Sequence, residues 1–355
     1  MSAPQGAGVT YAAAGVDTHA GDKAVELMKD AVRATHGPQV IGGFGGFAGL
    51  YDASALVGYR RPLLATSTDG VGTKVAIAQA MGVYDTIGWD LVGMLVDDLV
   101  VTGAEPLFVT DYIACGKVRP ERIAAIVGGI AAACTAAGAA LLGGETAEHP
   151  GLLGADEFDV AGATTGVVER DEILGAERVV PGDVVLALAS SGLHSNGYSL
   201  VRRVLADAGW GLEREVPELG GTLGEALLTP TRVYARDLLG IIRATQVHSI
   251  SHITGGGLAN NLARVLPAGV VAEIDRASWQ PPPVFGLVQQ LGGVSQADLE
   301  ATLNMGVGMA LVLPEESVAR ASEMAAAAGI EAWVAGVVRA AGEGPGSVAM
   351  HGAHA

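Results

Sequence analysis

The stretch STDGVGTKVAIAQA, residues Ser67 to Ala80, contains the parts of an anion-binding turn in an unusual order. Its glycines, threonine and lysine are typical of a phosphate loop. However, the spacing G-x-x-x-x-G-K-[ST] is absent, and an acidic residue, Asp69, comes first. Residues 63–68 before the turn predict a short buried strand, and residues 74–81 predict a helix. The stretch therefore predicts a strand–turn–helix unit, the repeating element of an α/β fold.

The turn itself allows two interpretations. In the first, Asp69 ends a strand at the edge where ligands gather in α/β folds, Gly70 lets the backbone approach an anion, and Thr73 and Lys74 begin a helix whose N–H groups face that anion. In the second, the turn has no ligand and Asp69 only caps the helix. The lysine favours the phosphate interpretation.

Strand and helix patterns alternate along the rest of the chain, which predicts an α/β (α+β) fold. The charged, turn-rich segment 169–183 divides it, so we expect an N-terminal domain over 1–172, a C-terminal domain over 173–345 and a flexible tail over 346–355. The expected helices are 86–103, 120–137, one from about 199, 231–244, 258–265, 283–291 and 315–328; the expected strands are 107–114, 139–142, 159–168, 184–190, 247–253, 270–274, 306–313 and 331–338.

The composition restricts the class of protein. Of 355 residues, 50% are apolar and 17% are charged, which is typical of a folded chain, and the net charge of −17 argues against a nucleic-acid partner. Cys115 and Cys134 lack metal-ligand spacing, so we expect free buried thiols in a reducing compartment. The first residues show no secretory signal, and the uncharged run 123–144 predicts a buried helix and strand better than a membrane span. We therefore expect a cytoplasmic protein without a membrane partner.

Asp98 stands out in the predicted helix 86–103. It lies seven residues after Leu91 and four after Met94, on the apolar stripe, whereas Asp97 lies about 100° around the helix. A carboxylate on a core face is costly unless it is paired or binds a cation. A structural salt bridge is one explanation, but few cationic residues are near in sequence, so a metal is favoured. Mg²⁺ is commonly held by one or two carboxylates and substrate phosphates, and Asp69 with Asp98 would supply the carboxylates.

The glycine-rich segment 41–52 formally fits a dinucleotide fingerprint, but the residues before it do not predict the required strand. A flexible glycine loop and a loop that lays backbone N–H groups over a polyphosphate remain equally good interpretations. Three polar turns, 143–151, 190–200 and 251–261, each follow a predicted strand and set polar side chains beside glycines. Together they predict a site built from both domains.

At these residues the sequence resembles the aminoimidazole ribonucleotide synthetase family, the phosphoribosylformylglycinamidine cyclo-ligases. The similarity covers nearly the whole chain. The segments that carry it, in order, are YAAAGVDTHAGD, IGGFGGFAGL, TDGVGTK, DTIGWDLVGMLVDDLVVTGAEPLFVTDY, GGETAEHPG, SSGLHSNGYSLVR, HITGGGLANNLARVLP and GVGM. TDGVGTK and the spacing from Asp98 to Pro106 are also similar to a wider ATP-binding superfamily that includes selenophosphate synthetase and thiamine-monophosphate kinase.

The resemblance implies two domains with mixed sheets packed with helices, a homodimer formed through the N-terminal sheets, and ATP and Mg²⁺ in a cleft between the domains. It implies ATP-dependent ring closure of formylglycinamidine ribonucleotide (FGAM) to 5-aminoimidazole ribonucleotide (AIR), with release of ADP and phosphate through an O-phosphorylated amide, in de novo purine biosynthesis. Such a protein is a ligase.

The resemblance also implies roles for single residues. Asp69 and Asp98 would hold Mg²⁺, and His194, Lys74 and Asp98 would be catalytic, with His194 transferring a proton. Relatives often have Asn at Asp97, so no metal contact is assigned there. The nucleotide would contact Lys29, Gly43, Gly45, Gly46, Asp69, Gly70, Thr73, Lys74, Glu145, Asn196, Thr254, Gly255 and Gly256, of which Asn196 would also approach the ribonucleotide.

The sequence leaves two other hypotheses open. Another enzyme of the superfamily is one, but a selenophosphate synthetase would want a catalytic Cys near the N-terminus, and neither cysteine lies before Tyr112. A non-catalytic nucleotide-binding protein is the other, but it would have no reason to keep Asp98 in an apolar stripe.

Overall fold

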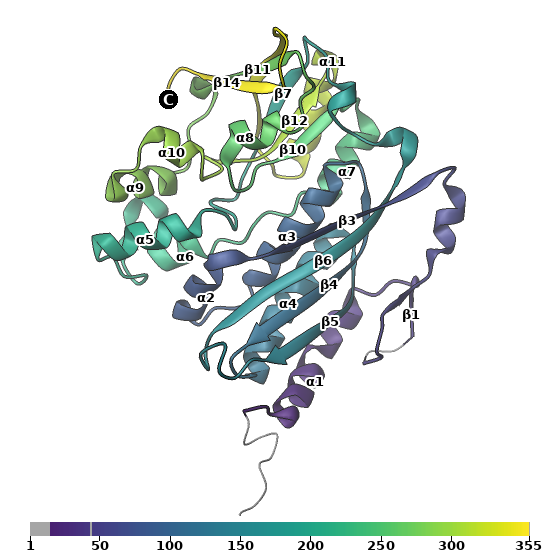
Figure 1. The fold of residues 1–355 in the computed structure, drawn as a ribbon, viewed down its shortest axis with the longest axis vertical. Coiled ribbons are helices and arrows are strands. Elements are labelled where there is room, and N and C mark those ends of the chain that lie inside the picture. The colour runs from purple at the N-terminus through teal and green to yellow at the C-terminus, as the bar shows by residue number, and fades with distance from the viewer. Residues whose placement is uncertain (1–14, 43–44, 355) are drawn as a thin grey trace, which may run out of the picture.

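The computed structural model describes residues 15–42 and 45–354, and forms two α/β halves, each built on its own sheet (Figure 1). Gly43 therefore lies outside the described residues. The elements of the first half are α1 (Thr18–Ala34), β1 (Val40–Ile41), β2 (Leu50–Tyr51), β3 (Pro62–Gly70), α2 (Val75–Met81), α3 (Ile87–Val100), β4 (Glu105–Cys115), α4 (Pro120–Ala137), β5 (Ala140–Glu148) and β6 (Phe158–Glu169).

The first sheet has the strand order β3-β6-β4-β5. β4 and β5 are parallel, and β6 runs antiparallel to both β3 and β4. The carboxyl-terminal ends of β3, β4 and β5 therefore lie at the same end of the sheet. Helices α3 and α4 pack behind this sheet, and Figure 1 shows its front face without a covering helix among the described residues. α3 contacts α4 closely at Gly88, where a Cβ atom would collide with the backbone of Gly129 and Ile130.

Helix α4 is the one described helix that is long and apolar enough to cross a membrane. It begins with Pro120 at its first turn and ends at Gly138, which adopts the left-handed conformation (φ 80°). More than half of it is buried inside the structure, between α1 and α3. Its apolar composition is thus that of a core helix, as the sequence predicted.

The second half is built on a six-stranded sheet with the order β10-β12-β7-β13-β11-β14, antiparallel except for the parallel pair β11 and β14. All seven residues of β12 are buried. The elements are β7 (Val184–Ala189), α5 (Tyr198–Ala208), β8 (Glu215–Val216), β9 (Gly221–Thr222), α6 (Leu223–Leu227), α7 (Ala235–Ala244), β10 (Ser249–His252), α8 (Gly257–Ala263), β11 (Val270–Asp275), α9 (Pro283–Gly292), α10 (Gln296–Glu300), β12 (Val307–Leu313), α11 (Glu315–Ala327), β13 (Ala332–Ala340) and β14 (Ser347–His351).

The expected flexible tail over 346–355 is wrong for the residues that form β14. Ser347 to His351 pair with β11, and after the strand the ring of His354 packs edge-on against Trp279 with 4.6 Å between ring centroids. The glycines and the proline before β14 hid this pairing, because only the tertiary structure supplies the partner strand.

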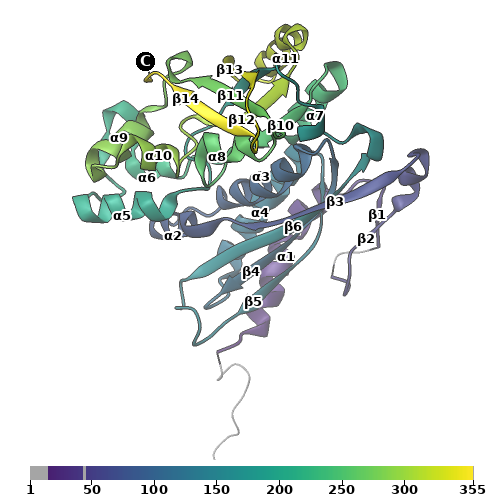
Figure 2. The same cartoon turned by 45° about the horizontal axis from the view of Figure 1, so that its top comes forward.

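The two halves share a continuous core. One cluster of buried apolar residues includes Leu91 and Leu95 of α3 together with Leu227 and Tyr234 of the second half. Figure 2 shows the second half lying over α2 and α3, with α5 and α6 next to α2. We call the contact zone between α2 and α3 of the first half and α5, α6 and α7 of the second half the seam. It contains most of the predicted site residues.

Candidate active site at the seam

Helix α3 carries three carboxylates that point to different surroundings. Asp90 and Asp97 are completely buried, whereas the side chain of Asp98 is 44% exposed. The prediction that Asp98 lies on the buried stripe is therefore wrong, and Asp97 is the buried one of the pair. The reason is that α3 is covered by the sheet on one side and by the second half on the other, so its burial does not follow a single stripe.

The carboxylate of Asp97 is used for contacts inside the protein. The backbone N–H of Tyr234 donates to its two carboxylate oxygens at 3.0 and 3.2 Å. Burial raises the pKa of Asp97 well above its ordinary value. It lies in the interior of the seam and is not accessible to a ligand.

Asp98 contacts the second half through His252, a residue that the sequence analysis did not single out. The Nδ1 atom of His252 lies 2.8 Å from Oδ1 of Asp98. Because an ionised carboxylate can only accept, Nδ1–H donates, and this contact leaves Oδ2 of Asp98 free. The ring of His252 is buried, and its Nε2 has no hydrogen-bond partner among the residues that the structure describes. The signal available in the sequence was the position of His252 at the end of a predicted strand, directly before the glycine turn.

Asp69 stands at the end of β3, and its Oδ1 accepts the N–H of Gly70 at 2.7 Å. The pKa of Asp69 is raised, mainly by desolvation and further by the negative charge of Asp98, while the Gly70 hydrogen bond opposes the shift. Two carboxylates that act on each other in this way, with free oxygens, form a donor set suited to a hard divalent cation. Within residues 15–42 and 45–354, no group of three or more His, Cys, Asp or Glu side chains is placed to hold a metal ion. Mg²⁺ at Asp69 and Asp98 would therefore need phosphate oxygens as further ligands.

Contacts across the seam bring several other predicted residues to the same place. Oγ1 of Thr73 lies 3.1 Å from Oγ of Ser199, at the start of α5. Nδ2 of Asn196 lies 3.4 Å from the sulfur of Met94, one helical turn before Asp98. A Cβ atom at Gly255 would lie 3.5 Å from Oδ1 of Asn196, so the turn of Thr254, Gly255 and Gly256 lies beside Asn196.

The ammonium group of Lys74 is not accessible to a ligand, which contradicts its predicted phosphate contact. Its side chain is fully buried, and Nζ donates to Oδ1 of Asp90 at 2.7 Å, to the carbonyl of Thr229 at 2.7 Å and to the carbonyl of His194 at 3.0 Å. An ammonium group has three donors, so none is left for a nucleotide. Burial lowers the pKa of Lys74, and the charge of Asp90 opposes this shift.

The ring of His194 is also buried, with 1% of the residue exposed. Its Nε2 accepts the N–H of Ser191 at 3.1 Å, and its Nδ1 finds no partner within residues 15–42 and 45–354. Burial lowers the pKa of His194 well below its ordinary value, and the neighbouring His252 and Lys74 add to this effect. Because the ring is buried under its own loop, the structure gives no support to the predicted proton transfer to a substrate.

A second group of predicted residues lies elsewhere. Gly45, Gly46 and Glu145 line a cavity of about 540 Å³ between α1 and the β5 edge of the first sheet, and Lys29 lies on α1 beside this cavity, near Glu26. β3 and β5 are opposite edges of the sheet, separated by two strands, or roughly 14 Å at the usual strand spacing. Within one chain the structure therefore does not bring this group to Asp69.

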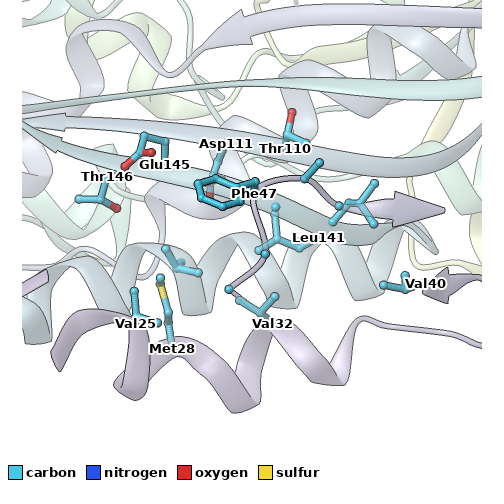
Figure 3. A pocket seen from close by; sticks show the side chains of 18 of the residues that line it. Val25, Met28, Val32, Val40, Phe47, Thr110, Asp111, Leu141, Glu145 and Thr146 are labelled. Atoms are coloured by element: carbon cyan, nitrogen blue, oxygen red, sulfur yellow. Dashed lines mark hydrogen bonds between the residues drawn. The ribbon is translucent and has the colours of Figure 1, made fainter. Parts of the chain in front are cut away.

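Figure 3 shows this cavity from close by. Val25, Met28 and Val32 point into it from α1, while Asp111 and Glu145 come from the strands. Burial raises the pKa of Asp111 to about 7. Sequence reasoning missed Asp111, although an acidic residue inside the apolar predicted strand 107–114 was a usable signal.

Comparisons with known proteins match both halves. The family model "AIR synthase related protein, N-terminal domain" matches residues 51–168, and the corresponding C-terminal domain model matches residues 180–348. Phosphoribosylformylglycinamidine cyclo-ligase of Desulfitobacterium hafniense is 49% identical over 337 residues, which cover 95% of this chain and 98% of the relative. The cyclo-ligase of Shouchella clausii is 50% identical over 329 residues, covering 92% and 95%.

Solved structures show the same fold at low identity. A thiamine-monophosphate kinase from Stenotrophomonas maltophilia has a TM-score of 0.68 at 19% identity, covering 93% of this chain and 97% of the kinase. The hydrogenase maturation protein HypE, solved in complex with ATP, has a TM-score of 0.59 at 19% identity, covering 89% and 86%. Since both halves match the family models and about half of the residues are identical to curated relatives, the chain belongs to the phosphoribosylformylglycinamidine cyclo-ligase family, the AIR synthases.

Proposed function

We propose that this protein catalyses the reaction of its family, the ATP-dependent closure of FGAM to AIR with release of ADP and phosphate, in de novo purine biosynthesis. The observation that carries the proposal is the 49% identity to a named cyclo-ligase over 95% of the chain. The seam supports it, because it combines paired carboxylates, a glycine turn and polar side chains of both halves. The protein is then a ligase that forms a cyclic C–N bond.

The chemistry requires an activated amide. The amide oxygen of the substrate attacks the γ-phosphorus of ATP, and ADP leaves. The amidine nitrogen then attacks the carbon that bears the O-phosphoryl group, the five-membered ring closes, and the former amide oxygen departs with phosphate as a proton is released. Such phosphoryl transfer asks a protein chiefly for positioning and charge neutralisation.

The residues at the seam can supply that positioning. The backbone N–H groups around Gly70 and the hydroxyl of Thr73 would bind the polyphosphate, while Asn196 and the turn 254–256 would hold the ribonucleotide from the second half. Asp69 and Asp98 would hold Mg²⁺, which neutralises phosphate charge when bound. Lys74 and His194 have no direct part in this proposal, because both are buried.

The protein would act as a homodimer. The uncovered face of the first sheet exposes apolar side chains, among them Leu64 at 67% and Tyr112 at 41%, and an isologous pairing of two such faces would bury them. In a two-fold pairing of this kind the β5 edge of one copy can lie over the β3 edge of the other. The nucleotide-binding role of Lys29, Gly43, Gly45, Gly46 and Glu145 would then be exercised at the site of the second copy.

We also infer a cytoplasmic location, which the two free, buried cysteines support.

We further propose that the boundary between the two domains lies at residues 172/173. The first sheet ends at Glu169 and the second begins at Val184, which supports this position.

The test is to incubate the purified protein with ATP, Mg²⁺ and FGAM and to measure ADP together with a diazotisable aminoimidazole. We expect both products in equal amounts. Asp183→Asn is a control variant, because Asp183 is buried in the second half and pairs with His248 there. ADP formed only with another acceptor, such as thiamine monophosphate, would contradict the proposal.

A further inference from the structure

Lys74 and Asp90 form a fully buried ion pair at the seam. Both side chains have zero exposure, and Nζ and Oδ1 are 2.7 Å apart. The pair lies within the first half, but its other hydrogen bonds all go to the second half. Nζ donates to the carbonyls of His194 and Thr229, and Oδ1 of Asp90 accepts both the N–H of Thr231 at 3.0 Å and its hydroxyl at 2.6 Å. The ion pair therefore ties two separate segments of the second half to α3.

One of these segments is the loop 190–197, which leads into α5 and carries Asn196. His194 adopts a left-handed backbone conformation (φ 59°), which is uncommon for a residue other than glycine and must be held by its surroundings. Lys74 holds the carbonyl of this residue. A second bond, from Oγ of Ser195 to the carbonyl of Val71 at 2.6 Å, fixes the next residue to the turn that contains Asp69 and Thr73.

The position of Asn196 relative to Asp98 is thus set by groups that cannot reach a ligand. Residues 69–73 belong to the first half and meet the cation and phosphates in the proposed function, whereas Asn196 belongs to the second half and meets the ribonucleotide. Lys74 follows the first group directly in sequence and binds the second group directly in space. A charge buried this deeply is costly, and replacing such a pair with apolar groups need not destabilise a protein, so stability alone is a weak reason for its presence.

We propose that Lys74 is a positioning residue that, paired with Asp90, fixes the 190–197 loop against the nucleotide-binding turn, and that it does not bind phosphate. This inference rests on the proposed function for the identity of the two substrates. The position of the loop itself can be measured without any reaction.

The test uses two variants. Lys74→Met leaves the Asp90 carboxylate buried without its partner and is expected to fold poorly, so the informative variant is the double change Lys74→Met with Asp90→Asn. This double variant replaces both buried charges with neutral side chains, keeps a hydrogen-bond acceptor for Thr231, and nearly conserves the side-chain volume. Asp183→Asn is the matched control, because it alters another buried carboxylate, one that is hydrogen-bonded to His248 and does not contact the loop.

We expect the double variant to bind MgATP within about threefold of wild type, while kcat/KM for FGAM falls about 100-fold, the loss typical of a small misplacement of reacting groups. Hydrogen exchange of the amides of residues 192–199 should accelerate at least about tenfold, since a removed tie lowers the local opening free energy. The control should lower Tm and leave these quantities unchanged.

Three results would overturn the inference. If the double variant lost as much affinity for MgATP as catalytic efficiency with FGAM, Lys74 would have to contact a phosphate after all. Unchanged kinetics with only a lowered Tm would reduce the pair to a structural role. Unchanged exchange over 192–199 would overturn it even if the protein proved to act on another substrate, which separates its failure from failure of the proposed function.

Discussion

Nδ1 of His252 lies 2.8 Å from Oδ1 of Asp98, and this contact joins the end of strand β10 to helix α3 across the seam. It fixes the direction of the one exposed carboxylate of α3 and leaves its second oxygen available. Groups that orient a metal-binding carboxylate usually affect metal affinity strongly. The pairing therefore leads to a prediction that is independent of turnover.

Replacing His252 with Phe should weaken divalent cation binding about 10- to 100-fold, because Asp98 loses the hydrogen bond that orients it. Mn²⁺ titration followed by electron paramagnetic resonance, with a non-hydrolysable ATP analogue present, measures this directly. His248→Phe is the control, since His248 pairs with Asp183 at the same distance in the same half. Equal Mn²⁺ affinity in wild type and His252→Phe would show that this contact has no part in cation binding.

The two neighbouring acids of α3 should respond in opposite ways. Asp98→Asn should abolish turnover with little change in Tm, because its side chain is 44% exposed and the amide preserves its shape. Asp97→Leu should leave the buried N–H of Tyr234 without an acceptor and lower the free energy of unfolding by about 1–3 kcal/mol. Thermal melts and steady-state rates of both variants test this. A fully active Asp98→Asn would remove the metal assignment.

Most elements of the fold could be predicted from local patterns. Helix 120–137 matches α4 residue for residue, because Pro120 and Gly138 mark its two ends. Helix α1 was not predicted. Its start does carry a signal, Asp17, whose side chain accepts the N–H of Ala20, but its buried stripe is narrow, with only Ala24 and Val32 buried.

The site was harder to predict because its contacts are remote in sequence. The motifs predicted Asp69 and Asp98 as a pair, and in the structure the charge of Asp98 raises the pKa of Asp69, but their metal binding stays a prediction. The role of Lys74 could not be inferred in this way, since its carbonyl partners lie 120 and 155 residues away. Likewise, the burial of α3 on two sides, by the first sheet and by the second half, exists only once the second half is in place, and it exchanges the expected environments of Asp97 and Asp98.

Asp111 should make the stability of the protein depend on pH near neutrality. Folded, its carboxyl keeps its proton up to about pH 7, whereas its ordinary pKa is 3.8. Between these values the folded state binds more protons than the unfolded state, so this contribution to stability falls as pH rises and reaches its lowest level above about pH 7. Asp111→Asn should therefore stabilise the protein more at pH 8 than at pH 5 in urea denaturation. The same gain at both pH values would contradict the raised pKa.

The proposed dimer divides each active site between two copies of the chain, so two inactive variants should complement each other. Asp98→Asn and Glu145→Gln should each be inactive when prepared alone. If Glu145 serves the site of the second copy, one site of each mixed dimer carries both changes and the other carries neither. Random mixing of the two variants makes about half of all dimers mixed, so activity should return to about a quarter of the wild-type level. The check is to denature and refold the variants together and separately, and then to assay AIR formation. Activity that stays at the level of the separate variants would mean that Glu145 and Asp98 of one chain serve the same site, or that Glu145 serves none.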